Sequence, residues 1–428
     1  MATSDSRFWH PFADMHAVRS AELTLVSGDG VHVTDEDGRR YLDGTASLWN
    51  VNVGHGRKEL AEAAAAQMRE LATYGAFGAF NNPRARELTD RLADLAPVDD
   101  PRIFLTSGGG DSIDTAAKLA RRYFAAIGQP ERVHLISRSQ GYHGTHGLGT
   151  SLGGIPANRV DVGPLDPNAS QVPHDSLEAL ETEIERVGAD RVAAVFVEPV
   201  IGAGGVHQPR EGYIEGVDAL CKRTGVLHVV DAVIAGFGRL GEWFSPERWG
   251  IEPDMITFAK GVTSGYMPLG GVLVGERVRA PFWDEPIAGA VFRHGYTYSG
   301  HSGAAAAALA NLDILEREQL VERVAALEPV LDKAVRRLEG AALVGEIRTV
   351  GLTAAVALKP SVLEADATAP DKVVAASLRH GVASRVLRGH AIHISPPFVI
   401  SEEQIDAMVD GIGNALEDVA GATAGVPA

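Results

Sequence analysis

Short apolar runs alternate with amphipathic stretches through the middle of the chain. Six runs are rich in Val, Ile, Leu and Phe: RIFLTSG (102–108), RVHLIS (132–137), RVAAVFVEP (191–199), VLHVVDAV (226–233), MITFAKG (255–261) and GGVLVG (270–275). Several are nearly continuous, as in strands that are buried on both faces. Helical patterns at 112–126, 176–188 and 213–225 lie between them, and the last two end at glycine. This alternation predicts a mostly parallel sheet covered by helices on both faces.

The two ends of the chain have a different pattern. Residues 30–44 (GVHVTDEDGRRYLDG) predict a β-hairpin that turns at Glu36–Gly38. Towards the other end, a long amphipathic helical region at 311–340 precedes short strands within 344–358 and 391–401. We therefore expect a smaller α+β unit that is built from both ends of the chain.

The length of 428 residues accommodates two domains of these kinds. We predict a large α/β domain at 61–320 and a smaller α+β domain that combines 1–60 with 321–428. The apolar fraction of 45% is that of an ordinary soluble protein, so a large core is available to both.

Net charge and cysteine content narrow the classes of function. The formal charge of −17 argues against nucleic acid as a partner, because no basic stripe is present to contact a phosphate backbone. The single cysteine, Cys221, excludes an internal disulfide and a cysteine metal cluster. His10, His16 and His55 lack metal-ligand spacing, so we expect no metal. No 18-residue apolar run and no apolar leader is present, which predicts a cytoplasmic protein without a membrane partner.

Two charged residues stand at the ends of apolar runs. Lys260 follows Met255–Phe258 almost directly, and Asp231 ends the run before it. Ligands of open parallel sheets bind at the carboxyl ends of the strands, so both side chains are expected at one edge. Alone, Lys260 is compatible with a solvated surface lysine, and the two residues together are compatible with a structural ion pair.

Two further features indicate a ligand at that edge. Ser107–Gly110 joins a strand to a helix N-terminus, where glycines let backbone N–H groups converge on an anion. Tyr142 and His143 follow another strand, and the tyrosine ring either stacks on a flat ligand or packs within its own loop. A phosphate cradle, an acid, a stacking aromatic and a lysine together match the needs of pyridoxal phosphate.

With these residues in place, the chain resembles the class III aminotransferases, the ω-amino-acid branch of the fold type I pyridoxal phosphate enzymes. The blocks that carry the resemblance run through nearly the whole length in the family's order: LWNVNVGHG, SGGGDSIDTAAKLAR, GYHG, EPVIGAGG, DAVIAGFGRLG, PDMITFAKG, HGYTYSGH and ISPPFVI. The resemblance implies the fold type I architecture, pyridoxal 5'-phosphate as cofactor, and a homodimer or a dimer of dimers.

The resemblance also implies a cofactor site at the matching positions: Gly109, Gly110, Tyr142, His143, Glu198, Asp231, Val233, Lys260 and Thr297. Lys260 and Asp231 are the expected catalytic residues. Lys260 is expected to bond the cofactor aldehyde and then to move a proton, and Asp231 to keep the pyridine nitrogen protonated. Val233 and Tyr142 are expected on opposite faces of the ring.

The phosphate end of the implied site depends on two segments. Gly109 and Gly110 match the phosphate-binding turn, and Glu198 matches a glutamate near the cofactor. Thr297, in HGYTYSGH, matches a threonine that reaches the phosphate of the neighbouring subunit, so the resemblance implies that the active unit is at least a dimer.

The sequence departs from the family pattern at two of these blocks. The phosphate turn reads Gly110-Asp111-Ser112 where the family has Ser-Glu-Ala, so a backbone contact replaces a serine hydroxyl. Ala232 stands where the family usually has a glutamate beside the ring-nitrogen acid. The second change removes a supporting carboxylate and leaves the main acid, Asp231, in place.

Substrate binding is expected to rest on an arginine and an aromatic wall. The resemblance implies that Arg385 or Arg388, in SRVLRGHAIHISPPF, binds the keto-acid carboxylate, although this segment has one residue more than the family's. Arg385 is our first choice, because Gly389 leaves Arg388 beside a turn. Trp49 and Phe77 match wall positions, with core packing as the alternative for Trp49.

We therefore expect an ω-aminotransferase that passes an amino group from an amine or ω-amino acid to pyruvate or 2-oxoglutarate. The N-terminal FWHPF also resembles the diaminopelargonate aminotransferases, which gives a second substrate class. The same residues are compatible with a pyridoxal phosphate racemase, mutase or decarboxylase of the same fold, and with a non-catalytic regulator that binds the cofactor. Only a transaminase requires a keto-acid acceptor.

Overall fold

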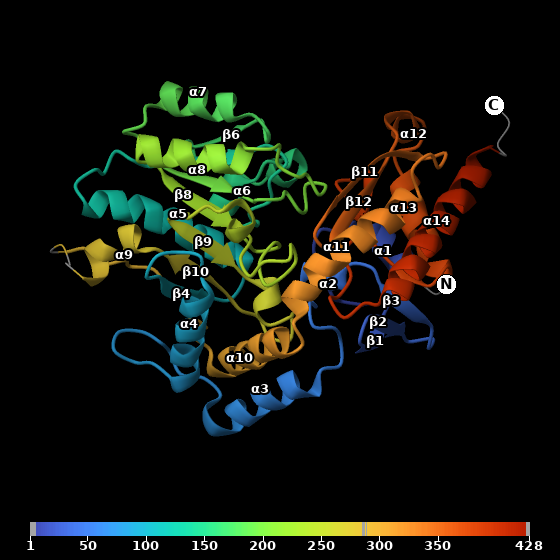
Figure 1. Ribbon diagram of the computed structural model, residues 1–428, viewed down its shortest axis with the longest axis horizontal. Helices are drawn as coiled ribbons and strands as arrows, with labels where there is room; N and C mark the ends of the chain where they lie inside the picture. The colour runs from blue at the N-terminus through green and yellow to red at the C-terminus, as the bar shows by residue number, and fades with distance from the viewer. Residues whose placement is uncertain (1–5, 285–286, 288, 425–428) are drawn as a thin grey trace.

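The computed structural model describes residues 6–284, 287 and 289–424. One half holds a large sheet and the other half holds two small sheets (Figure 1). No helix in these ranges is long and apolar enough to cross a membrane. The domain limits given above stay a prediction.

The large sheet has seven strands in the order β4-β10-β9-β8-β7-β5-β6. Its strands are β4 Arg102–Thr106, β5 His134–Arg138, β6 Ala169–Val172, β7 Val192–Val197, β8 Leu227–Asp231, β9 Met255–Phe258 and β10 Gly270–Val274. The pairs among β5 to β9 are parallel, whereas β10 is antiparallel to both β9 and β4. The mostly parallel sheet that the apolar runs predict is therefore confirmed.

The reversed direction of β10 follows from the connection that precedes it. A parallel neighbour needs a crossover of about a dozen residues or more, usually a helix. Between β9 and β10 the chain forms only a 3-10 turn, Lys260–Val262, before it re-enters the sheet. Lys260 therefore lies where the chain leaves the sheet and turns back.

Helices cover both faces of the large sheet, as predicted. Val195 of β7 packs in the cluster that contains α7 and α8, whereas the next residue, Phe196, packs in the cluster that contains α5. The helices of this half are α3 Lys58–Leu71, α4 Pro83–Leu95, α5 Gly109–Ala126, α6 Gly147–Leu152, α7 Leu177–Val187, α8 Tyr213–Thr224, α9 Glu276–Trp283 and α10 Ser302–Arg317. The three predicted helices are α5, α7 and α8, and α5 begins at Gly109 rather than at Ser112.

Two four-stranded sheets form the other half, in the orders β1-β2-β3-β13 and β11-β12-β15-β14. Their strands are β1 Leu25–Asp29, β2 His32–Asp35, β3 Arg40–Asp43, β11 Val344–Val350, β12 Thr353–Leu358, β13 Val382–Ala383, β14 Val386–Leu387 and β15 Ala391–Ile394. β2 and β3 form the predicted hairpin. The predicted short strands near the C-terminus are β11, β12 and β15.

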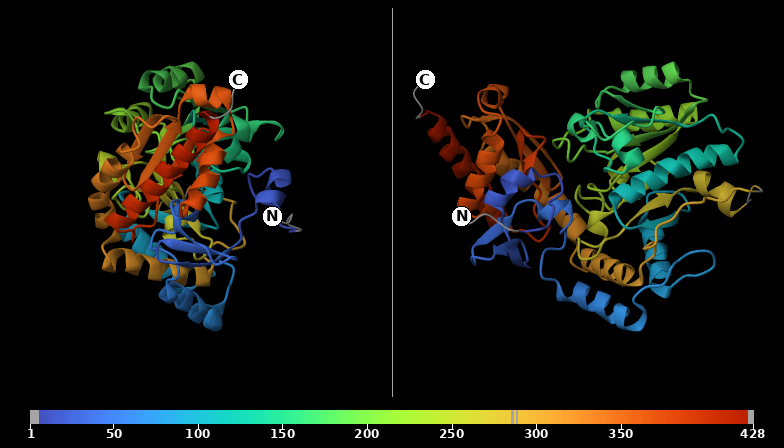
Figure 2. Two further views of the ribbon diagram at one scale, coloured as in Figure 1. Left: turned by 90° about the vertical axis from the view of Figure 1, so that its right-hand side faces the viewer. Right: turned by 180° about the vertical axis from the view of Figure 1, so that it is seen from behind.

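The helices of this half are α1 Met15–Ala21, α2 Ala46–Trp49, α11 Leu320–Arg336, α12 Pro360–Ala365, α13 Ala369–Arg379 and α14 Glu402–Ala424. Further 3-10 turns lie at Pro156–Arg159 and Pro246–Trp249. The region 311–340, predicted as one long helical stretch, is divided between α10 and α11. The break lies at Gln319, whose φ of +50° is left-handed. In both halves of Figure 2, α3 lies along α10, the helix that ends just before this break.

Candidate active site

Lys260 occupies a constrained backbone position at the end of β9. Its φ of +46° is left-handed, which is uncommon for a residue with a side chain. The next residue must be glycine, because a Cβ on Gly261 would stand 2.5 Å from Asn52 Nδ2 and 2.9 Å from Phe237 Cβ. Close packing therefore fixes the backbone around Lys260, which is unlike a solvated surface lysine.

Lys260 is partly buried as a residue, and its amino group interacts with three charged side chains. Burial lowers the pKa of Lys260, and the Arg385 guanidinium acts in the same direction, while Asp231 and Glu198 oppose it. The net shift of this pKa is downward, so a larger share of the lysine is neutral at a given pH. A neutral amine can act as a nucleophile or a base.

Asp231 ends β8 with its carboxylate held by neighbouring groups. His143 Nδ1 lies 2.8 Å from Asp231 Oδ2. The Val233 N–H and the Thr257 hydroxyl donate to Oδ1 at 3.1 Å and 3.3 Å. Asp231 and His143 are 4% and 2% exposed. An ionised carboxylate only accepts hydrogen bonds, so Nδ1 of His143 carries the proton in this pair.

Glu198 holds the loop that carries Tyr142 and His143. Its Oε1 accepts the Tyr142 N–H at 2.8 Å, and its Oε2 accepts the Gly202 N–H at 3.0 Å. Burial raises the pKa of Glu198, and Asp231 adds to the rise while His143 opposes it. Glu198 therefore positions this loop beside Asp231, a role that the sequence did not reveal.

The glycine-rich turn stands at the start of α5, against Val233. A Cβ on Gly109 would lie 2.8 Å from Val233 Cγ1, and a Cβ on Gly110 would lie 3.3 Å from the His146 ring. The first N–H groups of an α-helix have no acceptor within the helix. Here they belong to Gly109, Gly110 and Asp111, at the positive end of the helix dipole. This end of α5 is therefore suited to a phosphate group.

The side chains of Asp111 and Ser112, which follow in α5, form hydrogen bonds within the protein. The Ser112 hydroxyl oxygen lies 2.9 Å from Thr106 Oγ1 and 3.1 Å from the carbonyl oxygen of Phe258, inside the sheet. The Asp111 carboxylate accepts the Ser107 N–H at 3.2 Å. Contacts to an anion at this turn are therefore left to backbone N–H groups.

Two neighbours of the site were missed by sequence reasoning. His146 Nδ1 lies 3.3 Å from Asp111 Oδ1, so the imidazole stands beside an acid at the phosphate turn. The Phe12 ring meets the Tyr142 ring edge-on, with 6.3 Å between their centroids. FWHPF was the only available signal for Phe12, and the fold is needed to bring it to Tyr142.

Trp49 and Arg385 come together from distant parts of the chain. Cζ of Arg385 lies 4.8 Å from the centroid of the Trp49 ring, and the His393 ring lies 4.2 Å from the same indole. Trp49 is 3% exposed and has a φ of +58°. Burial lowers the pKa of Arg385, Tyr142 opposes this, and no carboxylate in the described part of the chain pairs with it.

Arg388, unlike Arg385, makes no cation–π contact with Trp49 within the described residues. It is exposed at the turn between β14 and β15, with a φ of +48°. The charge of Arg385, by contrast, acts on Lys260 and Tyr142. The structure therefore brings Arg385 to the site, and the binding roles of both arginines stay predictions.

Phe77 and Thr297 do not join this cluster within one chain. Phe77 is 56% exposed, and a Cβ on Gly295 would meet its ring at 3.4 Å. Thr297 is exposed in the same loop as Gly295. Phe77 also lines a surface cavity of about 1060 Å³ together with Phe80 and Trp283. These residues therefore face outwards from a single chain.

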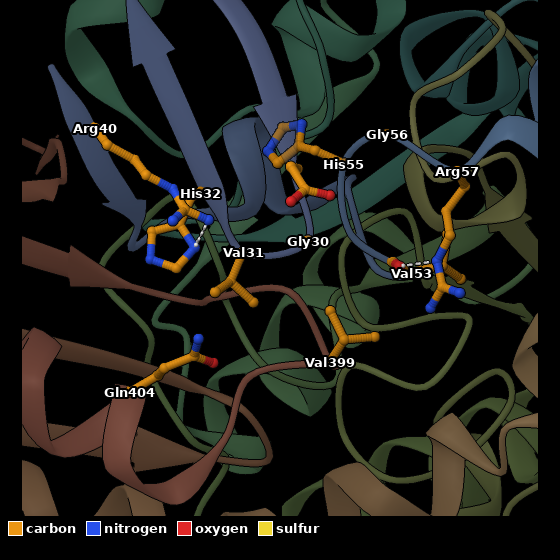
Figure 3. A pocket seen from close by; sticks show the side chains of 11 residues that line it. Gly30, Val31, His32, Arg40, Val53, His55, Gly56, Arg57, Val399 and Gln404 are labelled. Atoms are coloured by element: carbon orange, nitrogen blue, oxygen red, sulfur yellow. Dashed lines mark hydrogen bonds between the residues drawn. The ribbon is translucent and has the colours of Figure 1, made fainter. Parts of the chain in front are cut away.

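A separate cavity of about 430 Å³ opens on the small-sheet half (Figure 3). Val31, Val53 and Val399 form its apolar wall, and Arg40 and His32 lie together on one side with 3.1 Å between NH2 and Nδ1. The cofactor-site residues named above are absent from its described lining. The chemistry is therefore expected at Lys260 and not in this cavity.

The groups around Lys260 fit pyridoxal phosphate. The start of α5 presents N–H donors to a phosphate, and the space beside Gly109 is closed by Val233. Asp231 presents a fixed carboxylate of the kind that stabilises a protonated ring nitrogen. Tyr142 is an aromatic surface on the neighbouring loop.

Comparison with known proteins agrees with this geometry. The family model of class-III aminotransferases matches residues 15–416. A putrescine–pyruvate aminotransferase of Pseudomonas aeruginosa is 37% identical over 96% of this chain and 94% of the relative. A β-alanine–pyruvate aminotransferase of the same species is 34% identical over 96% of each.

Solved structures give the same result. An (S)-enantioselective ω-transaminase of Thermomicrobium roseum superposes with a TM-score of 0.91 at 40% identity, covering 96% of each chain. An amine transaminase of an uncultivated Pseudomonas species, solved with its PLP bound, gives a TM-score of 0.91 at 35% identity over 97% of this chain and 99% of that one. The chain therefore belongs to the class-III aminotransferases, which are pyridoxal-phosphate-dependent enzymes of fold type I.

Proposed function

We propose that this aminotransferase takes its amino group from an amine or an ω-amino acid and gives it to pyruvate or 2-oxoglutarate. The observation that carries the proposal is the Arg385 guanidinium, which lies over Trp49 and has no carboxylate partner in the described residues. An unpaired guanidinium beside Lys260 is suited to bind a substrate carboxylate through two parallel hydrogen bonds. Two similar enzymes carry the names of a diamine and an ω-amino acid as donors, each with pyruvate.

The cofactor supplies the electron sink of the reaction. Lys260, with its lowered pKa, offers a neutral amine that moves a proton to and from the substrate carbon. Asp231, held by His143, keeps a proton on the ring nitrogen. Gly109 and Gly110 bind the phosphate through N–H groups. These roles are our assignments for the residues of this chain.

Two residues set the substrate class. Trp49 supplies an apolar wall beside the cofactor, and Arg385 a cation at the edge of that wall. An amine with an uncharged tail uses the wall, and a keto acid uses the cation. Both substrates therefore fit one pocket if Arg385 can leave it.

We further propose a homodimer, or a dimer of dimers, in the cytoplasm. Thr297 and Phe77 face outwards from a single chain, on a surface that also exposes Phe80 and Trp283. In a dimer, Thr297 reaches the phosphate of the partner chain and Phe77 reaches the wall of its substrate pocket. A large exposed aromatic surface is typical of an interface between subunits.

The test is a panel of amines and ω-amino acids, each assayed with pyruvate and with 2-oxoglutarate. A transaminase turns over only with a keto acid and releases the matching amino acid. A racemase, mutase or decarboxylase of the same fold turns over without one, and that result would reject the proposal.

Arg385→Ala and Arg388→Ala form a matched pair within the same panel. We expect Arg385→Ala to raise the Michaelis constant for the keto acid by about tenfold or more, as for a lost charge-assisted hydrogen bond. The half-reaction with an uncharged-tail amine should change little. Arg388→Ala should leave both half-reactions near wild type, and the opposite result would assign the carboxylate to Arg388.

A further inference from the structure

His393 stands directly across a pair of strands from Arg385. β14 and β15 pair antiparallel with Val386 opposite Ile392. The register continues by one residue, because the His393 N–H donates to the Arg385 carbonyl oxygen at 3.0 Å. Residues opposite each other in an antiparallel pair place their side chains on the same face, with Cβ atoms about 5 Å apart. Arg385 and His393 are therefore neighbours on one face of the hairpin.

Trp49 covers both of these side chains. Its ring centroid lies 4.2 Å from that of His393, and 4.8 Å from Cζ of Arg385. Burial lowers the pKa of His393 well below its usual value, and the charges of Arg385 and Arg239 add to the effect. His393 is therefore neutral near pH 7 and offers one acceptor nitrogen.

Both ring nitrogens of His393 are buried without a hydrogen-bond partner in the described structure. Buried polar atoms are nearly always hydrogen-bonded, because an unpaired one loses its hydrogen bonds to water without forming a replacement, which costs free energy. A phenylalanine would present the same flat ring to Trp49 without this penalty. The imidazole therefore indicates a donor that reaches it in another arrangement of the pocket.

Arg385 is the donor best placed to do so. Its guanidinium carries five N–H groups, and no hydrogen bond from its side chain is formed within the described residues. The other cation beside His393, Arg239, is fully buried, and its two terminal nitrogens donate to two carbonyl oxygens and to Asn52 Oδ1, which leaves only its Nε unpaired among the described residues. Trp49 likewise offers a single unpaired N–H, Nε1 of its buried indole. Arg385 is partly exposed, whereas Arg239 is fully buried.

We infer that His393 is a positioning residue for Arg385, and that its neutral imidazole accepts a guanidinium N–H when the pocket holds an uncharged substrate tail. The inference rests on the proposed role of Arg385 in binding carboxylates. A keto-acid carboxylate offers two charge-assisted hydrogen bonds and draws Arg385 away from the weaker neutral acceptor. When the carboxylate leaves, the imidazole gives the guanidinium a second place to bind, outside the space that an amine tail needs.

Substitution of His393 separates this role from simple packing. His393→Phe keeps a ring against Trp49 and removes both nitrogens, whereas His393→Gln keeps an acceptor. The His393 imidazole competes with a carboxylate for the Arg385 guanidinium. Removing the imidazole nitrogens should therefore strengthen carboxylate binding. We expect His393→Phe to bind propionate, an unreactive carboxylate, about threefold or more tightly in calorimetry of the cofactor-loaded enzyme.

The same variant should impair the other substrate. The Michaelis constant for 2-aminobutane, an uncharged-tail amine, should rise about fivefold, because Arg385 then stays in the pocket. His393→Gln should follow the wild type in both measurements. A variant that weakens propionate and 2-aminobutane equally, or changes neither, would overturn the inference. His393→Leu replaces His393→Phe if the phenylalanine variant does not fold.

A double substitution distinguishes a failure of the His393 role from a failure of the carboxylate-binding role of Arg385. In the Arg385→Ala background, His393→Phe should have no effect on 2-aminobutane, because the two residues act on each other. An undiminished effect would reject the role of His393. If Arg385→Ala alone leaves the keto-acid Michaelis constant unchanged, the proposed carboxylate site is wrong instead.

Discussion

His143 Nδ1 and Asp231 Oδ2 lie 2.8 Å apart in a pair that is almost closed to solvent. β8 supplies the acid, and the loop after β5 supplies the imidazole, whose ring meets Phe196 edge-on at 6.3 Å. The imidazole fixes the position of the Asp231 carboxylate. The pair therefore presents a carboxylate of defined orientation to a protonated ring nitrogen.

Asp231→Asn should retain the cofactor and lose most activity. The amide has the size of the carboxylate but cannot stabilise a positive ring nitrogen as strongly. We expect the rate of the amine half-reaction to fall by about a hundredfold or more, by comparison with other electrostatic stabilisers. Stopped-flow absorbance of the cofactor measures this rate directly, and near-normal turnover would reject the role of Asp231.

Lys260 should be the one attachment point of the cofactor. The protein should be yellow, and borohydride reduction followed by peptide mapping should place the label on Lys260. Lys260→Ala should remove the label and the activity together. Lys222→Ala is the control, since Lys222 is an exposed helix lysine paired with Asp218. A label on another lysine would show that the strand-end residue has been misassigned.

The fold was predictable where a strand is buried on both faces. Every residue of β7 and β8 is buried, and both strands read as unbroken or nearly unbroken apolar runs in the sequence. The side-chain pattern of β10 did not predict its direction, because a buried strand looks the same in either direction, and only the short connection after β9 carries that information. The break at Gln319 was also hidden, since hydrophobic periodicity continues on both sides of one left-handed residue.

The candidate site was predictable where it lies at strand ends. Lys260, Asp231 and Gly109 follow apolar runs directly, so the sequence places them at one edge of the sheet. His393 was missed because its position depends on the register of β14 against β15. A shift of one residue in that register would turn the histidine to the other face, and composition does not reveal it.

Thr297 should act on the cofactor of the partner chain. Thr297→Val keeps the shape of the side chain and removes the hydroxyl, so we expect cofactor affinity to fall by about tenfold, as for a lost hydrogen bond to a charged group. Mixed dimers of Lys260→Ala and Thr297→Val chains provide the test. One site in each mixed dimer then has both native residues, and activity should recover at limiting cofactor. No recovery, or a fully active monomer in ultracentrifugation, would contradict the shared site.

The histidine at position 207 should make the protein less stable in acid. Burial lowers the pKa of His207 from 6.5 to about 4, and the charges of Arg348, His174 and His390 add to this. Because the pKa is lower in the folded chain than in the unfolded chain, the unfolded chain binds the proton first as the pH falls. The resulting loss in the free energy of unfolding is absent well above pH 6.5, grows as the pH falls, and reaches its full size only below pH 4.

The size of this effect follows from the shift in pKa. Between about pH 7.5 and about pH 5, His207 alone should remove about 1.5 kcal/mol from the free energy of unfolding, once solvent screening of a partly exposed ring is allowed for. His207→Gln cannot be protonated and should lose less stability than the wild type over this interval, as measured by denaturant unfolding. His16→Gln is the control, since His16 is exposed on α1. If the wild type and His207→Gln lost the same free energy of unfolding, His207 would not be held neutral in the folded protein. If His16→Gln lost less than the wild type, the acid sensitivity would belong to exposed histidines.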